Sequence, residues 1–396
     1  MDGIASARRL SDPPGPRPRF HRRERRAGDG YRVGIAGPQD DVEIRRLLRE
    51  TVFPGDVRVS LEREPDALAA GSIEGDVHHT LVARDRLTGR VAAIAGRSVR
   101  DAFVNGSVVR LGYFGQLRID RAFRDRRLLD AGFACCRRLH EGAGARLYLA
   151  SVVADNQPAR RLLRRRHDGW PCFLEVAGFV TVALTVGRAM GHVPPGIRIV
   201  NGSVVGLEAL ANCLRRNNRR YQFAPCWSAA DLRSPLRSRG LAAGDFVAAL
   251  RGDGVVGCLA CWDQRAFKQV VVRGYSPRLA RLRPLVNAAS PWTGMPRLPE
   301  NGTRLDSAYL SHVAVDEDDP DVLQALMTAG CLLAADRGIA TALAGFPDGS
   351  PLLRRARRSF PHRSYDSVLY VAFWEDGEGD ARALDGRPAN PELAIL

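Results

Sequence analysis

Apolar residues recur along the first half of the chain in the two spacings that distinguish helices from strands. Alternating or short continuous apolar runs predict strands over 31–37, 78–85, 91–99, 108–120, 146–154 and 178–186. Apolar residues three or four positions apart predict helices after Asp40 or Asp41, over 126–141, and from Asn156 with Pro158 in its first turn. Thr88-Gly89 predicts a hairpin, and Gly112 and Gly115 predict a bulge or a close approach of another backbone within their strand.

The second half of the chain repeats this order of elements. The helices predicted there span 204–216, 322–337 and 351–358, and the strands span 246–250, 255–263, 308–316, 341–346 and 368–374. Pro194-Pro195-Gly196 lies between the halves. We therefore predict an α/β protein with two copies of one architecture, residues 31–187 and 197–376, followed by an extension over 377–396.

Length and composition agree with two globular domains. The chain has 396 residues, of which 45% are hydrophobic and 26% are charged, so wholesale disorder is excluded. Residues 1–30 differ from the rest, because they are rich in Pro and Arg and hold almost no apolar residues. We expect this segment to be a disordered tail.

The formal net charge of +15 is concentrated in two segments. Residues 1–30 hold eight arginines and four acids, and residues 121–167 hold twelve arginines and four acids. The remainder is close to neutral, so a uniformly basic nucleic-acid-binding protein is not expected. An anionic ligand near 121–167 is the better interpretation, with contact of the basic tail with RNA or a membrane as a weaker alternative. Lys268 is the single lysine among 59 basic residues.

The eight cysteines do not form a disulfide or metal pattern. Cys258 and Cys261 form a CxxC within the apolar run VVGCLACW, and no second CxxC or His pair accompanies them at zinc spacing. We expect free thiols in a reducing cytoplasm, and no metal site. No apolar run approaches the ~20 residues of a membrane span, so no membrane partner is expected.

The residues that indicate chemistry are those after the long strand 108–120. A strand, a short loop and an Arg-rich helix start follow one another over 117–129. A helix N-terminus carries free N–H groups and a partial positive charge, so it favours anions, and the Arg side chains add formal charge there. A second helix start, at Asn156, offers a side-chain amide.

These residues resemble the GNAT superfamily of acyl-CoA-dependent N-acyltransferases. In that family a loop of pattern (Arg/Gln)-x-x-Gly-x-(Gly/Ala) holds the CoA pyrophosphate, and an Asn-x-x-Ala segment follows the next strand. This chain keeps the Arg as Arg124, has Arg127 and Leu129 in place of the two glycines, and matches the second segment with Asn156 and Ala159. With YFGQLRID, AYLSHVAVD and ALDGRP, the whole chain resembles bacterial proteins with tandem GNAT domains.

The resemblance implies two GNAT-like domains, each a mixed, mostly antiparallel twisted sheet flanked by helices. It implies acyl-CoA, with acetyl-CoA as the expected donor, and a small-molecule or peptide amine as the acceptor. The residues that it assigns to acyl-CoA binding are Leu117, Arg118, Ile119, Arg124, Asp125, Arg126, Arg127, Leu128, Leu129 and Asn156.

Catalytic residues are less clearly indicated. Acyl transfer to an amine needs a base for the ammonium and usually an acid for the departing thiolate. The Tyr that often serves as the acid in the family is replaced by Leu163, and residues 102–119 contain no Asp or Glu. Tyr113, Gln116 and His312 are the remaining candidates, although a histidine on an apolar strand is more often part of the core.

The second repeat differs at the position that matches the pyrophosphate loop. Five acids occupy the six positions from Asp316 to Asp321, and they would repel a diphosphate. We expect acyl-CoA in the first repeat only. The alternative function is a non-catalytic acyl-CoA-binding or interaction protein on a degenerate GNAT scaffold.

Overall fold

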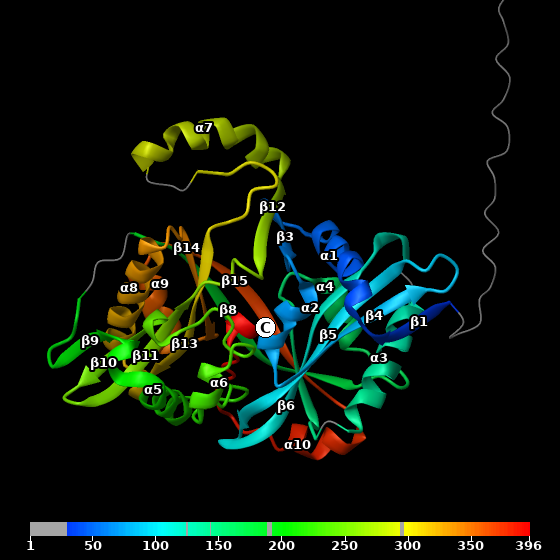
Figure 1. Ribbon diagram of the computed structural model, residues 1–396, viewed down its shortest axis with the longest axis horizontal. Coiled ribbons are helices and arrows are strands. Elements are labelled where there is room, and N and C mark those ends of the chain that lie inside the picture. The colour runs from blue at the N-terminus through cyan, green and yellow to red at the C-terminus, as the bar shows by residue number, and fades with distance from the viewer. Residues whose placement is uncertain (1–29, 124–125, 143, 188–191, 294–296) are drawn as a thin grey trace, which may run out of the picture.

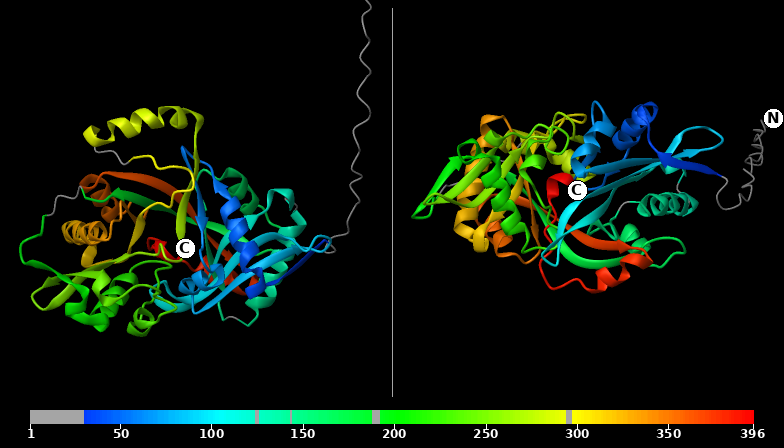
Figure 2. Two further views of the ribbon diagram at one scale, coloured as in Figure 1. Left: turned by 45° about the horizontal axis from the view of Figure 1, so that its top comes forward. Right: turned by 60° about the horizontal axis from the view of Figure 1, so that its bottom comes forward.

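The computed structural model describes residues 30–123, 126–142, 144–187, 192–293 and 297–396. Nearly all of the tail predicted over 1–30 therefore lies outside the described residues. The described chain forms a large twisted sheet with helices on both faces (Figures 1 and 2). Its twelve strands run in the order β1-β4-β5-β6-β7-β15-β8-β14-β13-β11-β10-β9. All neighbouring pairs are antiparallel except β6–β7 and β13–β14, so the predicted mixed, mostly antiparallel α/β sheet is confirmed.

The first half of the chain contains the elements predicted for it. They are β1 (Tyr31–Ile35), α1 (Asp41–Glu50), β2 (Val52–Phe53), β3 (Val57–Glu62), α2 (Ala67–Ala70), β4 (Val77–Asp85), β5 (Val91–Val104), β6 (Ser107–Ile119), α3 (Arg126–His140), β7 (Leu147–Val153), α4 (Gln157–Leu163) and β8 (Cys172–Thr185). The short strands β2 and β3 were not expected from the sequence.

The second half follows the same order. Its elements are β9 (Ile197–Asn201), α5 (Gly202–Asn218), α6 (Ala229–Arg233), β10 (Phe246–Arg251), β11 (Gly254–Trp262), β12 (Gln269–Tyr275), α7 (Pro277–Thr293), β13 (Ser307–Val315), α8 (Pro320–Asp336), β14 (Thr341–Pro347), α9 (Pro351–Ser359), β15 (His362–Phe373) and α10 (Glu378–Arg382). Here β9, α6, β12, α7 and α10 were not expected.

The halves interlock at the centre of the sheet. The last strand of the second half, β15, lies between β7 and β8, and β8 pairs with β14 of the second half. Each half therefore completes the sheet of the other. The boundaries 31–187 and 197–376 remain predictions, because one sheet runs through both segments.

A second, three-stranded sheet also joins the halves. Its order is β12-β3-β2, with Gln269 opposite Glu62 and Tyr275 opposite Val57. α7 follows β12 and stands away from the large sheet (Figure 1).

The internal repeat is visible in backbone geometry. Tyr113 on β6 pairs with Leu149 of the next parallel strand, and Tyr309 on β13 pairs with Leu343 in the same way. Three residues later each strand bulges, at Gln116 with φ 56° and at His312 with φ 54°. The two long strands thus occupy equivalent positions, and residues around Gln116 can be compared with those around His312.

Helices and the C-terminal segment cover the two faces of the sheet. α8 and α9 pack on one face through apolar residues such as Leu326 and Leu353, whereas α5 packs on the other through Leu210 and Leu214. The C-terminus lies in the middle of the molecule, between the halves (Figure 1). All eight cysteines are free, as expected. Among the described residues no helix is both long and apolar enough to cross a membrane.

Candidate functional site

The parallel strands β6 and β7 part from each other beyond a short paired stretch. Their register runs from Leu111 opposite Leu147 to Phe114 opposite Ala150 and ends there, although both strands continue. At this point β6 bulges, because Gly115 pairs with Gly96 on β5 while Arg118 pairs with Ile94. Two residues, Gln116 and Leu117, therefore face one on β5, and β6 turns away from β7.

Helices begin at the ends of both diverging strands. α3 starts at Arg126, shortly after β6, and α4 follows β7. Asn156 caps α4, because its Oδ1 accepts a hydrogen bond from the Ala159 N–H at 3.2 Å. Two helix N-termini at one end of a strand pair are a favourable setting for an anion.

Several residues predicted to bind acyl-CoA lie at this place. Arg124 and Asp125 lie outside the described residues, and nothing is described of the side chains of Arg126 and Arg127. The side chains of Leu128 and Leu129 are buried, so they face the core.

The end of β6 supplies a fixed cation. The guanidinium of Arg118 lies 4.8 Å from the ring centre of Phe53, and its Nε has no hydrogen-bond partner among the described residues. Burial lowers the pKa of Arg118 to about 10, so the side chain stays charged at neutral pH. Leu117 is 48% exposed, and Ile119 pairs with Ala93 on β5. Of the predicted residues on this strand, Arg118 is thus the one suited to hold an anion.

Of the predicted catalytic candidates, Tyr113 has the most polar neighbours on the adjacent strand β5. It lies opposite Ser98 on β5, and the Arg100 guanidinium sits 5.8 Å from the centre of its ring. Burial raises the pKa of the Tyr113 hydroxyl, so it is protonated at neutral pH. Gln116 lies three residues further along, at the bulge.

His312 sits in the core of the second half. Its ring contacts Trp227, Phe246 and Trp262, with ring centres 4.5, 5.4 and 5.6 Å away. Its Nδ1 is 2.9 Å from the Ser311 hydroxyl, and burial lowers its pKa to about 3, so the ring is neutral. This environment favours the structural role that the sequence left open.

A group of buried and half-buried polar residues lies beside Tyr113 and was not found from the sequence. We call Arg63, Glu74, His78, Ser98, Arg100 and Lys268 the central polar cluster. Arg63 forms an ion pair with Glu74, Ser98 donates to Glu74 Oε2 at 3.3 Å, and Arg100 donates to the Glu74 carbonyl at 2.8 Å. His78 Nδ1 is 2.9 Å from the Ser98 hydroxyl. Burial acts to raise the pKa of Glu74, but the charges of Arg63, His78 and Lys268 and the hydrogen bond from Arg63 together outweigh it, so the pKa is lowered and Glu74 is ionised.

Lys268 joins this cluster to the C-terminal segment. Its ammonium donates to the Ala394 carbonyl at 3.0 Å and lies 5.6 Å from the centre of the Tyr309 ring. Burial, reinforced by the charge of Arg63, lowers the pKa of Lys268 to about 8. A signal was present in the sequence, because this is the single lysine of an arginine-rich chain. Glu74 and Arg63 carried no comparable signal.

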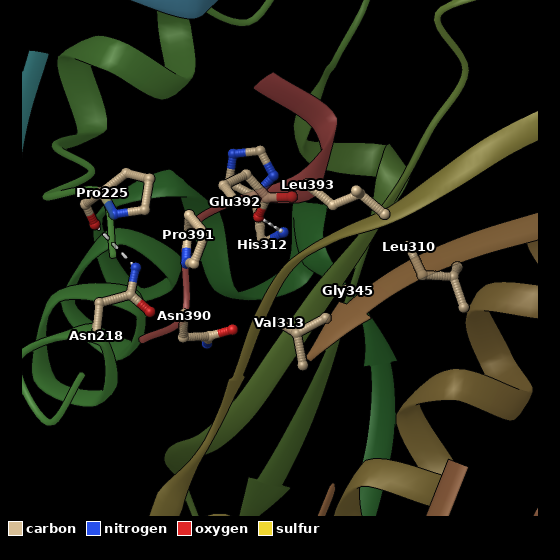
Figure 3. A pocket seen from close by; sticks show the side chains of 10 residues that line it. All are labelled: Asn218, Pro225, Leu310, His312, Val313, Gly345, Asn390, Pro391, Glu392 and Leu393. Carbon is tan, nitrogen blue, oxygen red and sulfur yellow. Dashed lines mark hydrogen bonds between the residues drawn. The ribbon is translucent and has the colours of Figure 1, made fainter. Parts of the chain in front are cut away.

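In the second half, the place that corresponds to the divergence of β6 and β7 is largely occupied by the C-terminal segment (Figure 3). The small pocket that is left is lined by Asn218, Pro225, Leu310, His312, Val313, Gly345, Asn390, Pro391, Glu392 and Leu393. Glu392 reaches into the bulge, where its Oε2 accepts the His312 N–H at 2.7 Å. The C-terminal segment thus occupies the second of the two equivalent sites.

Four of the five acids after β13 take part in structural contacts, among them Asp321, which pairs with Arg355. Asp316 pairs with Arg216, Asp318 pairs with Arg220, and Asp319 caps α8 by accepting from the N–H groups of residues 321 and 322. Two of the N-terminal amides of α8 are therefore already engaged. No group of three or more His, Cys, Asp or Glu residues in the described part of the chain could hold a metal ion.

No family model and no curated protein matches the chain, but solved structures do. Saccharomyces cerevisiae N-myristoyltransferase with bound myristoyl-CoA aligns at TM-score 0.56 and 12% identity, over 91% of this chain and 85% of that one. The GCN5-related glucosamine N-acetyltransferase region of a fungal multi-domain GH3 β-N-acetylglucosaminidase aligns at TM-score 0.55 and 13% identity over 87% of this chain. This chain spans 38% of that fungal protein. The likeness shows the fold: the chain has the GNAT fold in two tandem halves.

Proposed function

We propose that the protein is an acyl-CoA-dependent N-acyltransferase whose first half binds the acyl-CoA. The observation that carries this proposal is the contrast between the two equivalent bulges. At His312 the bulge N–H donates to a carboxylate of the C-terminal segment. Gln116 has nearly the same φ at the equivalent position, so we expect its N–H to point between the parting strands β6 and β7. This is the place for a thioester carbonyl.

The surroundings of Gln116 suit the rest of such a donor. The α3 and α4 N-termini and the Arg118 guanidinium would favour the phosphates of CoA. The two structural relatives bear names of N-acyltransferases, and one was solved with myristoyl-CoA. Both points support an acyl-CoA donor, and acetyl-CoA is the first donor to test.

The chemistry needs few groups from the chain. The amine nitrogen attacks the thioester carbonyl carbon, the C–S bond breaks, and the amine loses a proton while CoA leaves as a thiol. A backbone N–H aimed at the carbonyl oxygen would stabilise the negative charge that develops there. Tyr113, which is protonated at neutral pH, would give its proton to the departing thiolate and regain one from water. Water would also accept the proton that the amine loses.

The test is calorimetry with acetyl-CoA and longer acyl-CoAs, followed by a thiol-release screen over small-molecule and peptide amines. Arg124→Glu should weaken binding at least ~30-fold, because it reverses a charge next to phosphate and a charge-assisted contact is worth about 2 kcal/mol or more. Arg86→Glu is the matched control, since Arg86 is an exposed residue of the β4–β5 turn. Equal binding by both variants would refute the assigned site.

The second candidate function is acyl-CoA binding without catalysis. Leu163, at the position of the Tyr that often serves as the acid in the family, packs against an apolar cluster with Ala150 and Tyr370, and a leucine side chain has no proton to donate. The thiol-release screen separates the two functions. A Tyr113→Phe variant that binds acyl-CoA normally but releases thiol at least ~100-fold more slowly would favour catalysis, because general acids typically contribute that much.

A further inference from the structure

α7 presents a face that no other element of the described part of the chain covers. The helix spans Pro277–Thr293 and lies at one end of the molecule, beyond the three-stranded sheet (Figures 1 and 2). Its inner side is held by the segment after it, because Asn287 exchanges two hydrogen bonds with the Leu298 backbone, at 2.7 and 3.0 Å, and Arg283 donates to the same carbonyl at 3.1 Å. These contacts fix which side of α7 faces outward.

The outward side is apolar and basic at once. Leu282 is 51% exposed, Leu285 is 67% exposed and Trp292 is 84% exposed. Arg278 and Arg281 are exposed as well. At about 100° per residue, all five lie within an arc of roughly 100° around the helix. We call these five residues the outer face of α7.

The positive charge of α7 limits which kind of partner can bind its outer face. α7 contains three arginines and no acidic residue, so two copies of the outer face would repel each other. RNA would pair with the arginines but would leave the leucines in water. Against an anionic lipid surface, the apolar side chains of this face would enter the boundary of the acyl chains, and the guanidinium groups, on their long stems, would reach the anionic headgroups.

We propose that the outer face of α7 binds the surface of an anionic lipid bilayer, with the helix lying in the plane of that surface. This contact differs from a membrane span, which the described helices do not provide. It revises the expectation from sequence that the protein has no membrane partner. β12 runs from Lys268, in the central polar cluster, to α7, so the contact would hold the centre of the molecule at a set distance from the lipid.

The protein carries its own reporter for this contact. Of its five tryptophans, Trp170, Trp227, Trp262 and Trp374 are at most 9% exposed, whereas Trp292 is 84% exposed. A change in the accessible tryptophan signal therefore reports on α7.

The experiment adds the full chain to vesicles of phosphatidylcholine alone and to vesicles of phosphatidylcholine and phosphatidylglycerol in equal parts. With the anionic vesicles we expect co-sedimentation, a blue shift of tryptophan emission and protection from acrylamide quenching. With phosphatidylcholine alone, and with the anionic vesicles at high salt, we expect binding to fall at least ~10-fold, because attraction to headgroups is screened. Absence of binding to the anionic vesicles would overturn the proposal.

Variants separate the outer face from the rest of the surface. Leu285→Glu should abolish co-sedimentation, and Arg281→Glu should weaken it at least ~5-fold, since each basic residue near an anionic surface contributes attraction. Leu87→Glu is the matched control, because Leu87 is 76% exposed in the distant β4–β5 turn. Equal binding by Leu285→Glu and Leu87→Glu would overturn the proposal. A different partner would also overturn the proposal. This is the outcome if the original protein binds no vesicles but forms a dimer, or a complex with an RNA oligonucleotide, and Leu285→Glu abolishes that dimer or complex.

Discussion

At the scale of single residues, the bulges at Gln116 and His312 have similar backbone geometry but different surroundings. Gln116 and His312 have the same φ, yet His312 is enclosed by aromatic rings and its N–H is held by Glu392, whereas Gln116 lies where β6 parts from β7. The sequence indicated both residues as candidates, since they are polar residues on long apolar strands. It favoured a core position for His312, but it could not show that the group which fills the second site comes from residue 392.

The lowered pKa of Lys268 should be visible in the pH dependence of the protein's stability. Its pKa in the folded chain is about 8, against an ordinary value of 10.5. Below about pH 8 both folded and unfolded chains carry the proton, and the unfavourable burial of the ammonium is fully present. Between about pH 8 and 10.5 only the unfolded chain keeps the proton, so the stability contributed by this residue rises with pH.

We therefore expect the melting temperature of the original protein, minus that of Lys268→Met, to increase from about pH 7.5 to 9.5. Lys268→Arg, which stays charged throughout, should show no such increase relative to Lys268→Met. The measurement is thermal unfolding by circular dichroism at constant ionic strength. A flat difference would mean that the ammonium has an ordinary pKa.

Glu392 should matter for folding out of proportion to its place near the chain end. Its carboxylate accepts the N–H of His312 at 2.7 Å and that of Ala394 at 3.1 Å. Glu392→Ala leaves the buried His312 N–H without a partner, so we expect the free energy of unfolding to fall by about 1–3 kcal/mol. Glu392→Gln, which keeps an acceptor oxygen, should lose less.

Urea denaturation measures both losses. The control is Glu378→Ala, which removes only an exposed ion pair with Arg382 and should cost about 0–1 kcal/mol. If Glu392→Ala and Glu378→Ala were equally stable, the hydrogen bond between Glu392 and the His312 N–H would not contribute to the free energy of unfolding.

At the scale of elements, the apolar pattern predicted the long strands and helices well and the cross-connections poorly. β4, β5, β6, β10, β11 and β13 were all predicted near their observed bounds. β3 and β12 were missed, because each is stabilised by pairing with a partner some 200 residues away. The exchange of β8 and β15 was missed for a related reason: an apolar strand satisfies the same pattern whichever neighbours it has.

The packing of α3 and β7 against β6 predicts opposite effects for two glycines. A Cβ on Gly112 would lie 2.0 Å from the Tyr148 ring. That ring is stacked on Phe114 with centres 4.3 Å apart, and its hydroxyl is held by Arg97 at 2.8 Å, so it has little room to move. Gly112→Ala should therefore lower the free energy of unfolding by about 1–3 kcal/mol.

Gly132 is the matched position, because it lies within α3 and a Cβ there would meet no atom within 4 Å. Gly132→Ala should raise the free energy of unfolding by about 0.5–1 kcal/mol, since alanine is the better helix former. Both changes are measured by urea denaturation. Equal effects of the two substitutions would contradict the close packing of β6 on Tyr148.

At the scale of the whole molecule, the chain brings its polar centre together from segments far apart in sequence. Glu74 comes from the first half, Lys268 from the second, and the backbone of residue 394 from the C-terminal segment. Spacing along the sequence carries no information on such a meeting, so the predicted site contained none of these residues. What the sequence did indicate was the local part, the strand–loop–helix around β6 and α3, whose members are neighbours along the chain.

The interlocked sheet makes a definite prediction about the separated halves. A fragment of residues 31–190 would leave the β7 edge without β15 and would strip β8 of both its partners, β14 and β15. Long unpaired strand edges promote aggregation. We expect fragments 31–190 and 197–396 each to aggregate when expressed alone, and to form a soluble one-to-one complex when expressed together.

A second version of the experiment begins with the folded chain. A protease site inserted beside Pro194-Pro195, between β8 and β9, allows cleavage after folding. The two pieces should then elute together as one particle in size-exclusion chromatography and separate only in denaturant, because the β15 and β8 pairings hold them. The contrary result is a fragment 31–190 that is soluble, monodisperse and folded by itself. It would show that the first half folds without the pairing of β8 with β14 and β15 of the second half.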